Sequence, residues 1–157
     1  MIGARILLVD DEVVFTENMS ELLEMRGYRV TAVNDGQSAV DALADDDYDV
    51  VVLDLKMPGM DGLATLRELN RLDRFTETLI LTGHATINSA IEALRMGAYD
   101  YLTKPCEIDE LVEKIEGAWE KKSDTQQTDL EAKIRVLVES PKAALKLFPS
   151  RKKKGAD

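Results

Sequence analysis

Three carboxylates, one hydroxyl and one ammonium group stand at or close after the ends of apolar runs in this sequence: Asp10, Asp11, Asp54, Thr82 and Lys104. Asp10 and Asp11 are adjacent, and two carboxylates about 5 Å apart repel by roughly 3 kcal/mol at an effective dielectric constant of about 20. Such a pair requires a positive charge nearby. Carboxylate oxygens are hard ligands that suit Mg²⁺ or Mn²⁺, and a bound Mg²⁺ also accepts phosphate oxygens. The residue types therefore predict a Mg²⁺ site, able to take Mn²⁺.

Each of these residues also has a simpler structural explanation. Asp11 could cap the first turn of a helix, Thr82 could satisfy a backbone group at the end of a strand, and Lys104 could be a solvated loop charge. Their occurrence together at the ends of predicted strands favours a shared function over five separate structural roles.

The elements that position these residues are strands and helices in alternation. Strand-like apolar runs without polar alternation predict a sheet that is buried on both faces, and such sheets are parallel with helices on both sides. The predicted strands are Ile6–Val9, Arg29–Val33, Val50–Leu53, Thr78–Leu81 and Tyr99–Leu102.

Apolar residues at helical spacing lie between and after these runs and predict five helices. The first is marked by Phe15, Met19, Leu22 and Leu23, and Gly27 is a suitable residue to end it. Five strand–helix units in about 120 residues predict a doubly wound α/β domain, in which ligands bind beyond the carboxyl ends of the strands. All five polar residues named above gather at that edge.

Four motifs follow one another along the chain: LLVDDE (7–12), VVLDLKMPGMDG (51–62), LILTGHA (79–85) and YLTKP (101–105). In this order and at these spacings, they make the sequence from about Arg5 to Trp119 resemble the receiver domain of two-component response regulators. The resemblance implies the flavodoxin-like strand order 2-1-3-4-5, with five helices.

The resemblance implies that Asp54 accepts a phosphoryl group from a histidine kinase or a phosphotransfer protein. Asp10 and Asp11 would then hold Mg²⁺, together with Asp54 and the backbone carbonyl of Lys56. The chemistry agrees with these assignments: phosphoryl transfer depends on positioning and charge neutralisation, and a carboxylate nucleophile is already ionised at neutral pH.

The resemblance also implies the remaining site residues. Thr82 would bond a phosphoryl oxygen, and Lys104 would pair with the phosphoryl group or, before it arrives, with Asp54. Tyr101 would be the aromatic residue that turns inward when Thr82 shifts, which changes an output surface read by an effector protein or a second receiver. The Lys104-Pro105 bond would be cis. The expected protein is no enzyme beyond promoting its own phosphorylation and dephosphorylation.

Two other classes of protein fit the sequence less well. A haloacid-dehalogenase-like phosphatase also forms an aspartyl phosphate, but it needs a second acid two residues after the nucleophile, where this chain has Lys56. A flavodoxin-like nucleotide or flavin binder needs a phosphate loop rich in Gly, Ser or Thr after the first strand, and the Asp10-Asp11-Glu12 segment would repel phosphate without a metal.

Composition restricts the surroundings in which the protein works. The 157 residues are enough for one well-buried domain and a short extension, and no window approaches the twenty apolar residues of a membrane span. The start of the chain leads directly into a strand, so no signal peptide is expected. Cys106 is the single cysteine and suits a reducing cytoplasm. We expect a cytoplasmic protein without a membrane partner.

Charge divides the chain into two parts. Residues 1–122 carry 25 acidic and 12 basic side chains, whereas residues 123–157 carry 5 acidic and 8 basic ones, which gives net charges of −13 and +3. The acidic part, taken as the receiver domain 1–122, is therefore not expected to bind nucleic acid.

Residues 123–157 are expected to form a linker and an amphipathic helical extension. The polar stretch Lys121–Gln127 is typical of a linker, and Thr128 to Glu131 has the sequence of a capping box, which starts a helix. Ser140-Pro141 would start another helix, and the basic end 151–154 is expected to be solvated. Ala144, Leu147 and Phe148 would share one face of that second helix. The apolar residues of the extension that are expected to dock on the receiver or a partner are Leu130, Ile134, Leu137, Val138, Leu147 and Phe148.

Residues 123–157 are too few for a winged helix or an ATPase module, and the sequence contains no G-x-x-x-x-G-K-[ST] motif. The sequence therefore predicts a stand-alone receiver without a DNA-binding domain. The alternative is the receiver portion of a longer regulator that has a separate effector domain.

Overall fold

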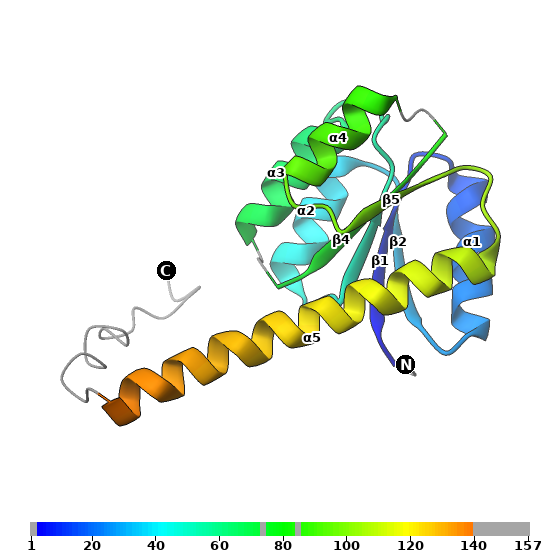
Figure 1. Ribbon diagram of the computed structural model, residues 1–157. Helices are drawn as coiled ribbons and strands as arrows, with labels where there is room; N and C mark the ends of the chain where they lie inside the picture. The colour runs from blue at the N-terminus through cyan, green and yellow to red at the C-terminus, as the bar shows by residue number, and fades with distance from the viewer. Residues whose placement is uncertain (1–2, 73–74, 84–85, 140–157) are drawn as a thin grey trace. The chain divides into compact units, whose positions relative to one another are not determined.

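The computed structural model describes residues 3–72, 75–83 and 86–139. Within them, five parallel strands form one sheet in the order β2-β1-β3-β4-β5, which confirms the predicted fold (Figure 1). The strands are β1 (Arg5–Val9), β2 (Arg29–Val33), β3 (Val50–Leu53), β4 (Glu77–Thr82) and β5 (Asp100–Thr103).

Helices cover both faces of this sheet (Figure 1). The described helices are α1 (Val13–Met25), α2 (Gly36–Asp45), α3 (Gly62–Leu72), α4 (Ile87–Arg95) and α5 (Ile108–Glu139). Helices α1 and α5 pack on one face, where Leu23 and Ile115 are fully buried, and α2, α3 and α4 pack on the other, around Ala39 and Leu66. Apolar side chains alternate between two cores along each central strand, which explains why the strand sequences show no polar alternation.

The register of the central strands brings the two most buried carboxylates together. Val9 of β1 pairs with Leu53 of β3, and each is followed directly by an aspartate. The Asp54 N–H donates to the carbonyl of Val9 at 3.0 Å, so the ladder continues for one bond past the strand ends. Asp10 and Asp54 therefore leave the sheet side by side at its carboxyl edge.

The chain divides into two compact units, Met1–Lys122 and Ser123–Asp157. The prediction of a linker at Lys121–Gln127 is wrong, because α5 runs without interruption from Ile108 to Glu139. The segment is polar but contains neither Gly nor Pro, so nothing in it opposes helix formation. The capping-box prediction fails for the same reason: Glu131 lies inside the helix and accepts a hydrogen bond from Gln127 at 3.1 Å.

The described part of the second unit is the continuation of α5. Leu130, Ile134 and Val138 lie four residues apart on it and are each at least half exposed. The predictions for Ser140-Pro141, Ala144, Leu147, Phe148 and the basic end fall outside the described residues. None of the described helices combines the length and the apolar character that crossing a membrane requires.

Candidate functional site

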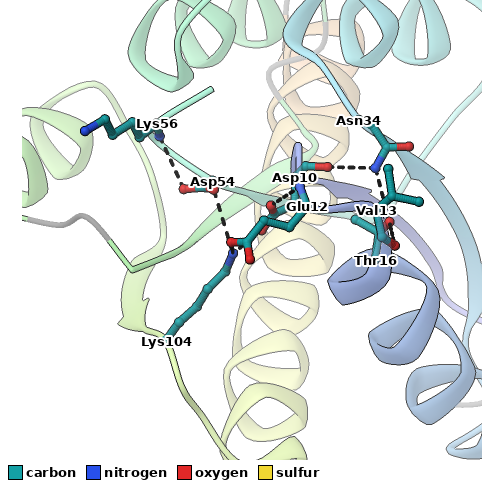
Figure 2. A network of polar contacts seen from close by, with 8 residues as sticks. All are labelled: Asp10, Glu12, Val13, Thr16, Asn34, Asp54, Lys56 and Lys104. Carbon is teal, nitrogen blue, oxygen red and sulfur yellow. Dashed lines mark hydrogen bonds and ion pairs between the residues drawn. The ribbon is translucent and has the colours of Figure 1, made fainter. Parts of the chain in front are cut away.

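Asp54 lies at the carboxyl end of β3 and only 2% of it is exposed. Its Oδ1 accepts a hydrogen bond from the backbone N–H of Lys56 at 3.2 Å, while the Lys56 side chain extends away from it (Figure 2). The carboxylate is therefore fixed by the loop that follows it, and Lys56 contributes through its backbone.

Asp10 lies beside Asp54 and is equally buried. Its Oδ1 accepts the backbone N–H of Glu12 at 2.9 Å. Its carbonyl, which lies beyond the last ladder bond of β1, accepts a hydrogen bond from Asn34 Nδ2 at 2.8 Å (Figure 2). The same amide group contacts the Thr16 hydroxyl at 3.1 Å. Asn34 thus holds the backbone of Asp10 against the start of α1.

Lys104 brings a positive charge to these carboxylates from the loop after β5. Its peptide bond to Pro105 is cis, as the family resemblance implied. The Nζ atom lies 2.5 Å from Asp10 Oδ2, 2.8 Å from Glu12 Oε1 and 3.8 Å from Asp54 Oδ2. The family resemblance predicts that Lys104 pairs with Asp54 before phosphorylation, whereas its closest partner in the structure is Asp10.

Burial and charge act against each other in this group. Burial raises the pKa of Asp10, although the hydrogen bond from Lys104 counteracts part of the rise. Burial alone would lower the pKa of Lys104, but its contacts with Asp10 and Glu12 outweigh that effect and raise it. The site therefore retains a charged ammonium group among its carboxylates.

The carboxylates that the structure brings together differ in one member from the predicted set. One oxygen from each of Asp10, Glu12 and Asp54 lies within 4.8 Å of the others. Asp11 is exposed and stands outside this group, on a pocket that Glu12, Lys56 and Met57 also line. Glu12 caps α1 without a side-chain cap bond, so Asp11 does not have the capping role considered for it.

The donor set fits a hard divalent cation. The three clustered groups offer carboxylate oxygens, and a cationic group of the protein itself, the Lys104 ammonium, already lies among them. Mg²⁺ and Mn²⁺ prefer such ligands.

The two predicted switch residues lie on adjacent strands. Thr82 ends β4 and is fully buried, and its carbonyl accepts the backbone N–H of Lys104 at 3.0 Å. Tyr101 lies on β5 with 41% of its surface exposed. The backbone bond between Thr82 and Lys104 links the end of β4 to the loop that carries the ammonium group.

Sequence reasoning missed three residues of this site: Glu12, Asn34 and Phe15. Asn34 directly follows β2, so the strand-end rule that identified Asp54 could have found it. Glu12 belongs to the LLVDDE motif, but the resemblance assigns it no role at the site. Phe15 lies with its ring 4.2 Å from Lys104 Nζ, and its apolar spacing gave no sign of contact with a charge.

Comparison with known proteins identifies the class that this fold and site define. Residues 6–116 match the response regulator receiver domain. The chain therefore belongs to the receiver domain family of response regulators.

Individual relatives agree. Regulatory protein AtoC of Escherichia coli (strain K12) is 39% identical over 107 residues, which cover 68% of this chain and 23% of AtoC. A CheY-like receiver domain protein from Methanospirillum hungatei JF-1 superposes with a TM-score of 0.76 at 25% identity, over 78% of this chain and 98% of that one. A response regulator from Burkholderia pseudomallei, solved with a phosphorylated aspartic acid, a calcium ion and citrate, gives a TM-score of 0.70 at 25% identity, over 93% and 92% of the two chains. The chain thus spans less than a quarter of AtoC.

Proposed function

We propose that this receiver accepts a phosphoryl group on Asp54 from a histidine kinase or phosphotransfer protein, in a Mg²⁺-dependent reaction. The observation that carries the proposal is the position of Asp54. It is a buried carboxylate at a strand end, with an ammonium group at 3.8 Å and a second buried carboxylate beside it. Structural roles rarely require two buried carboxylates at one point, because burying charge is costly.

In the transfer, a carboxylate oxygen of Asp54 forms a bond to phosphorus as the phosphorus–nitrogen bond of the donor phosphohistidine breaks. The electron pair stays on the histidine nitrogen, which takes up a proton. The Lys56 N–H orients the nucleophile, and Lys104 supplies positive charge near the transferring oxygens. Asp10, Asp11, Asp54 and the Lys56 carbonyl are the groups that would hold a Mg²⁺, which would supply the remaining charge neutralisation.

Phosphorylation is proposed to act through Thr82 and Tyr101. Thr82 is buried at the end of β4, where its carbonyl accepts the Lys104 N–H, and Tyr101 on the neighbouring strand is 41% exposed, so its ring is not held in the core. The resulting surface would be read by an effector protein or a second receiver. The phosphorylated aspartic acid of the Burkholderia pseudomallei regulator supports phosphorylation of an aspartate in this fold.

The receiver acts on no substrate other than its own aspartate, and a cytoplasmic location fits its partners. It serves either as a stand-alone receiver or as the receiver portion of a longer regulator. Two relatives support the second arrangement, because the segment that matches this chain covers only 23% of AtoC and 50% of YkoG from Bacillus subtilis (strain 168).

The test is labelling by acetyl phosphate or by a phosphorylated kinase in the presence of Mg²⁺. Asp54→Asn should abolish labelling, because the amide is a poor nucleophile and cannot form an acyl phosphate. Asp47→Asn, which changes an exposed aspartate, is the matched control and should label normally. Undiminished labelling of Asp54→Asn would overturn the assignment.

A further inference from the structure

The Lys104 ammonium is held on the side of the site that faces α1. It contacts Asp10 at 2.5 Å and Glu12 at 2.8 Å, whereas Asp54 is 3.8 Å away. The ring of Phe15 lies 4.2 Å from the same nitrogen. Two of these four groups, Glu12 and Phe15, lie at the beginning of α1 and contact the ammonium there.

Glu12 and Phe15 are suited to act together. Glu12 is the N-cap of α1 and Phe15 lies three residues later, so the two side chains share one face of the helix. Phe15 packs against the core that contains Leu8 and Leu23, which fixes its ring. An aromatic face attracts an ammonium ion, and Glu12 adds an opposite charge.

We infer that Phe15 and Glu12 are positioning residues that keep the Lys104 ammonium on Asp10, so that a divalent cation must displace Lys104 before it can bind Asp10. This inference rests on the proposed function, in which Asp10 is a ligand of Mg²⁺. After displacement, the ammonium is free to move toward Asp54, where the phosphoryl group would arrive. The beginning of α1 thereby sets how readily the site takes up metal.

Phe15 gives the sharper test because its ring carries no charge. Phe15→Leu keeps an apolar side chain in the core but removes the attraction for the ammonium. The variant should therefore bind Mg²⁺ about two- to fivefold more tightly in calorimetric titration, as expected for the loss of one partly exposed cation–π contact. Met19→Leu is the matched control, because Met19 is a buried core residue one turn further along α1. It should leave the affinity unchanged.

The effect should require Lys104. In a Lys104→Met background, no ammonium competes for Asp10, so Mg²⁺ should bind more tightly and Phe15→Leu should add nothing. Tightening of equal size in both backgrounds would show that Phe15 acts on the metal ligands by another route and would overturn the inference.

Nuclear magnetic resonance of the wild-type protein provides a readout that does not depend on a variant's stability. The Lys104 Hε protons, assigned by comparison with Lys104→Met, should resonate upfield in metal-free protein because the adjoining Nζ lies 4.2 Å from the centre of the Phe15 ring. Saturating Mg²⁺ should remove that shift as the side chain leaves the ring. An upfield shift that persists at saturation would mean that metal and Lys104 do not compete.

Glu12 needs a comparison of backgrounds because its carboxylate also attracts the metal. In the wild-type background, Glu12→Gln removes both that attraction and a contact that holds Lys104, and the two effects oppose each other. With Lys104→Met only the lost attraction remains, so the affinity should fall further there. Equal losses in the two backgrounds would remove Glu12 from the inference.

The outcomes separate this inference from the function on which it rests. Failure of the wild-type protein to bind Mg²⁺ would overturn the metal part of the proposed function, and the inference with it. Mg²⁺ binding by the wild type without tightening in Phe15→Leu would overturn the inference alone.

Discussion

Among the individual residues, Asp11 is where the sequence and the structure differ most. Its adjacency to Asp10 suggested two carboxylates in one crowded group, but Asp11 is exposed, and Glu12 takes its place in the cluster. The family resemblance implies that Asp11 binds the metal, whereas its exposure implies that it contributes little to stability. The two contributions can therefore be measured separately.

Asp11→Ala should weaken Mg²⁺ binding, because it removes a carboxylate near the cation, while the free energy of unfolding in metal-free buffer changes by less than about 0.5 kcal/mol. Calorimetric titration and denaturant unfolding in the presence of a chelator would measure the two quantities. Asp47→Ala controls for the loss of an exposed charge. A loss of stability well above that bound would mean that Asp11 supports the start of α1 after all.

The positions of Asp10, Asp54, Thr82 and Lys104 could be predicted because the carboxyl ends of parallel strands meet at one edge, so residue order along the chain translates into proximity. The partner of Lys104 could not be predicted in this way. A lysine side chain is long, and its ammonium group settles where charge and an aromatic face combine, which depends on how α1 packs against the sheet.

The loop between β3 and α3 is the element that fixes Asp54, and Gly62 closes it. The Gly62 N–H donates to the carbonyl of Leu55 at 2.9 Å. A Cβ atom on Gly62 would lie 2.3 Å from Leu55 Cα and 2.5 Å from the Asp54 carbonyl oxygen. Both contacts are with backbone, which cannot rotate away as a side chain could.

Gly62→Ala should therefore destabilise the protein by about 2 kcal/mol or more, a size associated with steric overlap in a packed region. Phosphorylation of Asp54 should also slow, because the backbone that carries it must shift. Gly83→Ala is the control for stability, since a Cβ there would meet only the Lys104 side chain, at ordinary contact distance. Unfolding curves that match for Gly62→Ala and wild type would contradict the predicted clash.

Two lysines of α5 form ion pairs with carboxylates at the amino ends of β3 and β4, on the edge of the sheet opposite the site. Lys122 Nζ lies 2.8 Å from Asp49 Oδ1, and the Arg5 backbone N–H donates to Asp49 Oδ2 at 2.7 Å. Lys121 lies 3.4 Å from Glu77, a buried carboxylate at the start of β4. The polarity of this stretch predicts a linker, yet Lys121 and Lys122 have charged partners that only the fold reveals.

The contacts of Asp49 predict a pH dependence of stability. Burial would raise its pKa, but the hydrogen bonds from Arg5 and Lys122 outweigh burial and lower it. A carboxyl group with a lowered pKa in the folded state stabilises the protein above its unfolded-state pKa, and this contribution disappears as pH falls through the folded-state pKa. Asp49→Asn should cost about 1–2 kcal/mol at neutral pH, and the difference from wild type should shrink below about pH 4. Denaturant unfolding between pH 3 and pH 7 would measure it, and a difference that stays constant over this range would contradict the prediction.

At the scale of the whole molecule, the fold could be predicted because the continuous apolar sequence of the central strands indicates burial on both faces. The continuity of α5 could not be predicted. Whether a polar segment forms a helix or a linker depends on what precedes it. Here Leu111, Ile115 and Ala118 pack into the core, and the helix that they start continues through residues that do not oppose it. The second unit therefore begins within a helix rather than after a break.

The division into two units predicts that the first one folds alone, provided that the lysines of α5 are kept. Its two apolar cores draw on residues 4–119, so a chain ending at Gln127 should unfold at the same denaturant concentration as the full chain and should still label at Asp54. A chain ending at Glu120 keeps the same cores but leaves Asp49 and Glu77 without Lys122 and Lys121. The free energy of unfolding of this chain should be lower by about 1–3 kcal/mol, as expected when partly buried carboxylates lose charged partners. Equal stability of the two shortened chains would show that the lysines contribute nothing, whereas a large loss in the chain ending at Gln127 would show that the second unit supports the first.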